Sequence, residues 1–198
     1  MISLDEEYIG TDNASIFIHG LKVCGGLLGR LNNGALIGAH FSSSVTPEEI
    51  LVGCTYLRNR FCNLHPVQEA YFIANLAEWQ SRNDQYGNTH KLIADLKLML
   101  NYNGKIKVSD KNIIGRSVDV RCDTGTPVTL RYRVTPNPDP ATVVGSNNVK
   151  YVKHQSIGGE RTRTPVVIDT NNEPHRHQVP NDVVTGLAAF RPEMFVPL

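Results

Sequence analysis

The stretch SIFIHGLKVCGGLLGRLNNGALIGAHFSSS, residues 15–44, decides the fold that we expect. Residues 15–23 are rich in β-branched and apolar side chains, which favours a buried strand. Asn32-Asn33-Gly34 predicts a hairpin-type turn, because Asn-Gly tolerates the positive φ values of a type I′ turn. Residues 35–41 then predict the returning strand. We therefore expect two apolar strands joined by a turn.

A cysteine and a histidine stand at the ends of these predicted strands. Cys24 directly follows the first strand and His40 lies near the end of the second. A neighbouring imidazole can take the proton of a thiol, and only the thiolate is a useful nucleophile. Gly25 and Gly26 allow close approach of the backbone, whose N–H groups can stabilise an oxyanion. From these residues alone, an ordinary buried cysteine and a satisfied core histidine remain the alternative.

The chain after this stretch becomes helical and then returns to strands. Thr46-Pro47-Glu48-Glu49 predicts a helix start with a capping box. Apolar stripes predict helices from residue 46 to His65-Pro66 and over 67–80 and 89–100, and alternation predicts strands over 105–108, 117–121 and 128–134. This order indicates an α+β fold, a β-sandwich-like sheet core with helices packed on one side. We expect a core over residues 1–134 and an irregular extension over 135–198, with short strands at 143–144, 149–152 and 166–168 and a short helix at 183–190.

Composition excludes several classes of protein. The chain has 198 residues, enough for one domain, and a net charge of +1, which does not suggest a nucleic-acid binder. No apolar run approaches the roughly 20 residues of a membrane helix. The first ten residues lack the charged and apolar regions of a secretory signal peptide. The four cysteines show no zinc or disulfide spacing, and we interpret them as free thiols: Cys24, Cys54, Cys62 and Cys122.

Three histidines in the C-terminal part are candidate metal ligands. His175 and His177 would lie on one side of an extended strand, and His154 precedes them. No carboxylate or cysteine at a suitable spacing completes a site, so we expect solvated histidines and no metal or cofactor. His19 lies on the first predicted strand, close to Cys24, and we expect it to be structural or at the rim.

The motifs GLKVCGG and GALIGAH resemble the Cys–His core of the CheD-type glutamine deamidases. Gly20, Leu21 and Cys24 match the motif that precedes the family's nucleophile. The strand that carries the family's histidine is matched by Gly38, Ala39, His40 and Phe41. The later run IIGRSVDVRCDTGTPVTLRYR, residues 113–133, is similar to the closing strands, so the likeness covers residues 15–134. The catalytic domains of cytotoxic necrotizing factors and Burkholderia lethal factor have a similar fold and dyad.

The resemblance implies a hydrolase that converts a glutamine of a target protein to glutamate through a thioester intermediate. Cys24 would be the nucleophile, His40 its base, and Gly25 and Gly26 would support the oxyanion. The protein would be a bacterial toxin or effector involved in virulence, secreted into a host cytoplasm, or an enzyme of the bacterial cytoplasm. Its partner would be the target protein, a host protein in the first case. Two alternatives are a non-catalytic protein-binding module on the same fold and a chemoreceptor-type deamidase.

The sequence departs from the family pattern at the group that orients the histidine. The family has a threonine at the position of Ile18 and a serine at that of Val23. A backbone carbonyl takes over the orienting role in the necrotizing factors, and the same is an expectation here. The hydroxyls of Ser15 and Ser42 are the side-chain candidates.

Overall fold

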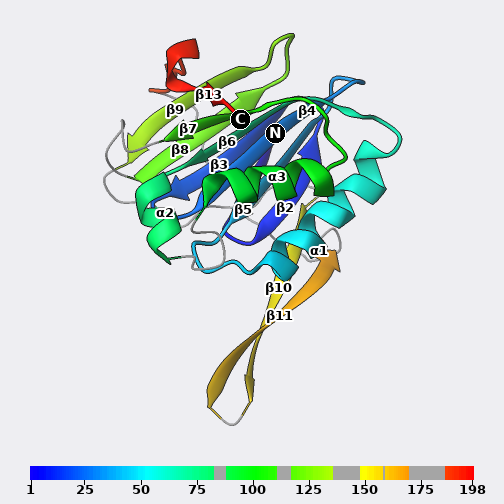
Figure 1. The fold of residues 1–198 in the computed structure, drawn as a ribbon, viewed down its shortest axis with the longest axis vertical. Coiled ribbons are helices and arrows are strands. Elements are labelled where there is room, and N and C mark those ends of the chain that lie inside the picture. Colours follow the sequence, from blue (N-terminus) through cyan, green and yellow to red (C-terminus); the bar gives the residue numbers. More distant parts are fainter. Residues whose placement is uncertain (83–87, 111–116, 136–147, 158, 170–185) are drawn as a thin grey trace.

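The computed structural model describes residues 1–82, 88–110, 117–135, 148–157, 159–169 and 186–198. It is an α+β structure of three layers, with two β-sheets packed face to face and helices on the outer side of the larger sheet (Figure 1). The smaller sheet has the order β1-β3-β8-β9-β12, and the larger has the order β11-β10-β2-β5-β4-β6-β7-β13. The fold class expected from the sequence is therefore present.

The strands of the smaller sheet are β1 (Ile2–Leu4), β3 (Ser15–Leu21), β8 (Ser117–Asp123), β9 (Thr129–Thr135) and β12 (Ala188–Ala189). Those of the larger sheet are β2 (Tyr8–Asp12), β4 (Gly25–Leu31), β5 (Leu36–Phe41), β6 (Val67–Ala74), β7 (Ile106–Asp110), β10 (Asn148–Ile157), β11 (Glu160–Asp169) and β13 (Val196–Pro197). The helices are α1 (Pro47–Leu57), α2 (Leu76–Arg82) and α3 (Thr89–Met99). A π-helical segment, Arg58–Cys62, extends α1, and a 3₁₀ turn, Pro192–Met194, lies near the C-terminus.

The decisive stretch forms three strands, where two were expected. A turn at Asn32-Asn33-Gly34 joins β4 to β5 as expected, but it is not of type I′, because Gly34 has a positive φ and Asn33 does not. The strand before β4 in the chain, β3, belongs to the smaller sheet. Cys24 therefore lies in the short connection that crosses from the smaller sheet to the larger one.

Two apolar layers of side chains lie between the smaller sheet, the larger sheet and the helices. One lies between the sheets and includes Ile18, Leu28 and Val120. The other lies between the larger sheet and the helices and includes Phe72 and Leu96. Because side chains alternate along a strand, the central strands β4, β5 and β6 contribute to both layers. Burial of this apolar surface is the main stabilising contribution to the fold.

The helix expected over residues 67–80 is wrong for its first half. Residues Val67–Ala74 form β6, a strand in the interior of the larger sheet, and only Leu76–Arg82 are helical. An interior strand is covered on both faces, so its apolar residues form a nearly continuous run without alternation. The alanines of this segment coincide with a helical period by chance. In contrast, the capping box at Thr46 and Glu49 is confirmed, as is the helix beginning at Thr89.

The C-terminal part contributes to both sheets. β10 pairs with β2, β13 with β7, and β12 with β9. β10 and β11 form a long hairpin that leaves the body of the molecule as a narrow arm below α1 (Figure 1). Two ten-residue strands thus replace the short strands expected at 149–152 and 166–168. Residues 143–144 and most of the first turn of the helix expected from 183 lie outside the described residues, and Ala188–Ala189 are a short strand.

Candidate active site

Cys24 and His40 face the same layer, the one between the two sheets. Gly26 lies directly opposite His40 in the β4–β5 register, and a Cβ on Gly26 would meet Ile18 and Leu21 of the smaller sheet. Directly opposite residues point to the same face, so the His40 side chain enters the layer between the sheets. Cys24 is buried in that layer, with 5% of its surface exposed. The fold thus brings thiol and imidazole to one end of this layer.

The hydrogen bonds of His40 define its tautomer. Its Nδ1 lies 3.1 Å from the carbonyl oxygen of Leu4, which can only accept, so Nδ1 carries the hydrogen. Burial lowers the pKa of His40 to about 4, so the ring is neutral at pH 7 and Nε2 has a lone pair. Nε2 is buried and has no hydrogen-bond partner among the described residues. A backbone carbonyl therefore orients the imidazole, and neither Ser15 nor Ser42 does so.

The thiol of Cys24 is protonated in this arrangement. Burial, together with the negative charge of Glu6, raises its pKa to about 12, although the backbone N–H of Ser43 opposes the rise. The Glu6 side chain, which is exposed, lies close enough to the thiol to favour its neutral form. Because Nε2 of His40 has no partner, the thiol and the imidazole are not hydrogen-bonded. The resting pair is a neutral thiol beside a neutral base.

Sequence reasoning missed Glu6 and Ser43. Glu6 belongs to the turn of residues 5–8 between β1 and β2, and Ser43 follows β5. Both reach Cys24 from segments distant along the chain, so no local pattern could indicate them. Only the run of three serines after Phe41 could have suggested a loop with free backbone N–H groups near the end of the strand.

Gly25 and Gly26 begin β4, which has β5 on one side and β6 on the other. A Cβ on Gly25 would lie 2.7 Å from the Phe72 ring, so close packing requires glycine there. The backbone N–H groups that reach the Cys24 thiol are those of Ser43 and Val23. A role of Gly25 and Gly26 as oxyanion donors stays a prediction.

His19 is part of an ion-pair cluster on the smaller sheet. Its Nδ1 lies 2.8 Å from Oδ1 of Asp119, and Arg133 donates to the other carboxylate oxygen. A register irregularity separates Ile18 from Leu21, so His19 leaves the regular alternation of β3. Burial raises the pKa of Asp119, but hydrogen bonds from His19, Gly20 and Arg133 outweigh it and hold the value at about 2. This cluster gives His19 a structural role.

The C-terminal histidines form no metal site in the described part of the chain. His154 lies on β10, and its Nε2 is 2.7 Å from a carboxylate oxygen of Glu7. His175 and His177 lie outside the described residues. No group of three or more metal-ligating side chains occurs among the residues that the structure describes. In the same ranges, no helix is long and apolar enough to cross a membrane.

Two surface hollows lie away from Cys24. One has a volume of about 620 Å³ and is lined mainly by the outer side of α1, including Leu51 and Tyr56, with Val167 of β11. The other has about 410 Å³ and lies between β9 and the C-terminal residues, including Phe190 and Phe195. Neither is lined by Cys24 or His40.

Comparisons with known proteins give no relative. No protein-family model, no curated protein and no solved structure matches this chain. The likeness of the Cys24 and His40 motifs to the CheD-type deamidases therefore remains an expectation from the sequence.

Proposed function

We propose that this protein is a cysteine-dependent protein-glutamine deamidase. One observation carries the proposal: the buried His40 donates through Nδ1 to the Leu4 carbonyl and keeps an unpartnered, unprotonated Nε2 in the layer that also holds Cys24. A buried nitrogen without a partner costs free energy, on the order of 1–3 kcal/mol. A general base needs this tautomer, with its free lone pair. A core histidine with a purely structural role would be expected to use both ring nitrogens.

The reaction follows from these groups. Nε2 of His40 takes the thiol proton while the sulfur of Cys24 attacks the carboxamide carbon of a glutamine. The oxyanion forms near the backbone N–H of Ser43, which already faces the sulfur. The imidazolium donates its proton to the departing nitrogen. Ammonia is released, and the glutamine side chain remains bound to Cys24 as a thioester. Water, deprotonated by Nε2, hydrolyses the thioester and yields glutamate and the free thiol.

In this scheme the thiol of Cys24 is inactive until a substrate binds. With a thiol pKa of about 12 and a His40 pKa of about 4, the proton stays on sulfur until a substrate arrives. In this scheme the glutamine side chain displaces the Glu6 carboxylate, whose charge raises the pKa of the thiol. Displacement removes a negative charge that opposes the thiolate. Binding and activation are therefore one event.

The test is mass spectrometry of a protein lysate incubated with the wild type and with Cys24→Ser. We expect one or a few glutamines to become glutamate with the wild type, with release of ammonia, and no conversion with Cys24→Ser. Cys62→Ser is the matched control, because Cys62 has the same 5% exposure and lies in the other apolar layer. Absence of conversion with a folded wild type across lysates from several sources would contradict the proposal.

A protein-binding module on the same fold is the second candidate. Two observations favour it: the thiol is buried and protonated, and α1 presents an apolar hollow in which Leu51 is half exposed. Such a protein would capture a partner without modifying it, and capture would be unaffected by Cys24→Ser. Retention of partner binding together with unmodified glutamines would favour this function over the deamidase.

A further inference from the structure

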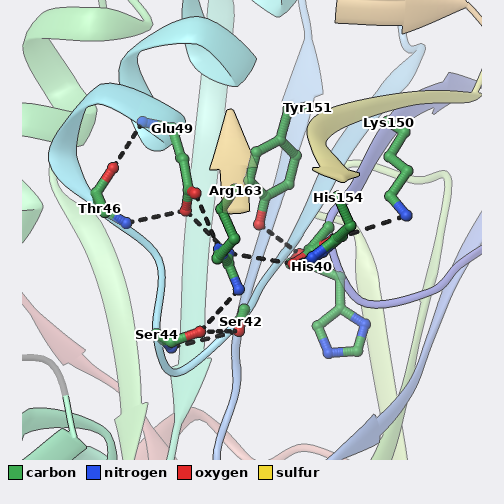
Figure 2. A network of polar contacts seen from close by, with 10 residues as sticks. His40, Ser42, Ser44, Thr46, Glu49, Lys150, Tyr151, His154 and Arg163 are labelled. Atoms are coloured by element: carbon green, nitrogen blue, oxygen red, sulfur yellow. Dashed lines mark hydrogen bonds and ion pairs between the residues drawn. The ribbon is translucent and has the colours of Figure 1, made fainter. Parts of the chain in front are cut away.

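Tyr151 of the β10–β11 hairpin reaches the backbone of the candidate site. Its side chain is fully buried, and its hydroxyl donates to the carbonyl oxygen of His40 at 3.0 Å. The backbone N–H of Ser42 also lies close to this hydroxyl oxygen. Figure 2 shows the Tyr151 hydroxyl directed at the His40 backbone, with the His40 ring pointing away from the polar cluster. One hydroxyl thus bridges two peptide groups at the end of β5.

Arg163, on the partner strand β11, joins two carboxylates and a serine. Its guanidinium donates to both carboxylate oxygens of Glu49, at 3.0 and 2.9 Å, and to the hydroxyl of Ser44 at 2.9 Å (Figure 2). It also lies 3.1 Å from a carboxylate oxygen of Glu7. Bidentate arginine–carboxylate pairs are strong and fix geometry. By binding Ser44 and Glu49 together, Arg163 holds the loop of residues 42–44 against the first turn of α1.

The same hairpin fixes the turn that carries Glu6. Glu7 has a φ of 72°, an uncommon conformation for a residue that is not glycine. Its backbone N–H donates to the His40 carbonyl at 2.9 Å, and its side chain is paired with His154 and Lys150 of β10. These contacts over-determine a turn that would otherwise be strained. The same turn carries Glu6, whose charge raises the pKa of the Cys24 thiol.

We propose that Tyr151 and Arg163 are positioning residues, through which the β10–β11 hairpin clamps the two segments that enclose the Cys24 thiol. These segments are the turn of residues 5–8, which carries Glu6, and the loop of residues 42–44, which carries Ser43. The C-terminal hairpin then completes the site, and residues 1–134 alone lack the groups that set its geometry. The purpose of the clamp rests on the proposed deamidase function, but its effect on the thiol can be measured without a glutamine substrate.

Alkylation by iodoacetamide, followed cysteine by cysteine by mass spectrometry, tests this proposal in the full-length protein. Cys62 is an internal reference, because it is as buried as Cys24 and lies in the other apolar layer. Tyr151→Phe removes only the hydroxyl and keeps the ring that packs edge-on against Phe41. Loosening of the loop should expose the thiol and lower its pKa. We expect the Cys24 rate relative to Cys62 to rise by up to about tenfold, the effect of a fall of one pKa unit on the thiolate fraction.

Two further variants make the result specific. Tyr102→Phe is the matched control, since the Tyr102 hydroxyl also donates to a backbone carbonyl, that of Lys105, away from the site. It should leave the Cys24 to Cys62 ratio unchanged. Arg163→Lys keeps the positive charge but loses the two-pronged contact with Glu49, and we expect a rise smaller than that of Tyr151→Phe.

The outcomes separate the two proposals. A ratio within about twofold of the wild type in Tyr151→Phe overturns the clamp. So does an equal increase at Cys24 and Cys62, which would indicate general loosening of the fold. A selective rise at Cys24 supports the clamp whether or not any glutamine in a lysate is converted. If conversion does occur, Tyr151→Phe should lower kcat with little change in KM, because the hydroxyl positions His40 and Ser42 and touches no substrate.

Discussion

His40 and His19 are both buried, and each has an oxygen atom next to Nδ1, but the two oxygens differ in charge. For His40 the oxygen is the Leu4 carbonyl at 3.1 Å, and for His19 it is the Asp119 carboxylate at 2.8 Å. A carboxylate stabilises an imidazolium, whereas a carbonyl accepts a hydrogen bond without supplying a charge. Asp119 is in addition paired with Arg133. The carboxylate makes His19 the more basic ring, and it is the unpartnered Nε2 of His40, in the layer that holds Cys24, that favours His40 as the candidate base.

Proximity along the chain would have given the opposite assignment. His19 is closer to Cys24 in the sequence than His40 is, yet its partner lies on β8 of the smaller sheet. The unpartnered Nε2 of His40, not distance in sequence, is the feature that favours it as the base. The predictions below test this difference between the two histidines and then its consequences for the thiol.

The largest expected effect is on activity. If the proposed reaction occurs, His40→Ala should lower kcat by about 10²–10⁴-fold, the usual contribution of a general base. His19→Ala should retain most of the activity per folded molecule. Rates of ammonia release, normalised to the folded fraction from circular dichroism, provide the measurement. Equal losses in the two variants would contradict the assignment of His40 as the base.

The second effect is on acid stability. The pKa of His40 is about 4 in the fold and 6.5 without it, so the unfolded chain binds more protons between these values. The stability is fully present above pH 6.5 and falls as the pH drops toward 4, by roughly 3 kcal/mol for a shift of this size. Urea titrations at pH 7 and pH 4.5 measure this loss. His40→Gln should show a smaller loss between the two pH values; the same loss as in the wild type would mean that the imidazole is not kept neutral by burial.

The local parts of this structure could be predicted from sequence, and the long-range parts could not. The capping box at Thr46 and the turn at Asn33-Gly34 depend on neighbouring residues, and both are present. The strand β6 was mistaken for a helix because its two faces are covered by the helices and by the smaller sheet, which come from elsewhere in the chain. Propensity is a weak guide when tertiary contacts decide.

The candidate site divides in the same way. Cys24 and His40 could be named because both have side chains with recognisable chemistry. The group that orients His40 is a backbone carbonyl, which every residue has, so the sequence carries no signal for Leu4. Tyr151 contacts His40 from more than a hundred residues away, in a region whose composition suggested an irregular extension. A single sequence does not reveal such a pairing.

A third prediction concerns the carboxylate of the structural cluster. Asp119→Asn removes the charge that pairs with His19 and Arg133, and we expect it to lower the free energy of unfolding at pH 7 by about 2 kcal/mol. Asp123→Asn is the matched control on the same strand. Asp123 also pairs with two arginines but is partly exposed, so its loss should cost less than about 1 kcal/mol. Urea unfolding of both variants gives the difference, and equal costs would refute the distinction. The lowered pKa of Asp119 also predicts a pH effect in the wild type. The free energy of unfolding should fall as the pH drops from 3.8, the ordinary pKa of an aspartate, toward 2.

The smallest effect separates the charge next to the thiol from its burial. Glu6→Gln keeps the size of the side chain but removes its negative charge. That charge is the second-largest cause, after burial, of the raised pKa of Cys24. The pKa of the thiol should fall, and alkylation of Cys24 relative to Cys62 should increase several-fold, by at most about tenfold, at pH 8. Glu48→Gln, an exposed glutamate in the first turn of α1, is the control and should have no effect. An unchanged Cys24 rate in Glu6→Gln would mean that burial alone keeps the thiol protonated. The turn of residues 5–8 would then act on Cys24 only as a cover, and a substrate would activate the thiol by displacing the turn rather than by removing a charge.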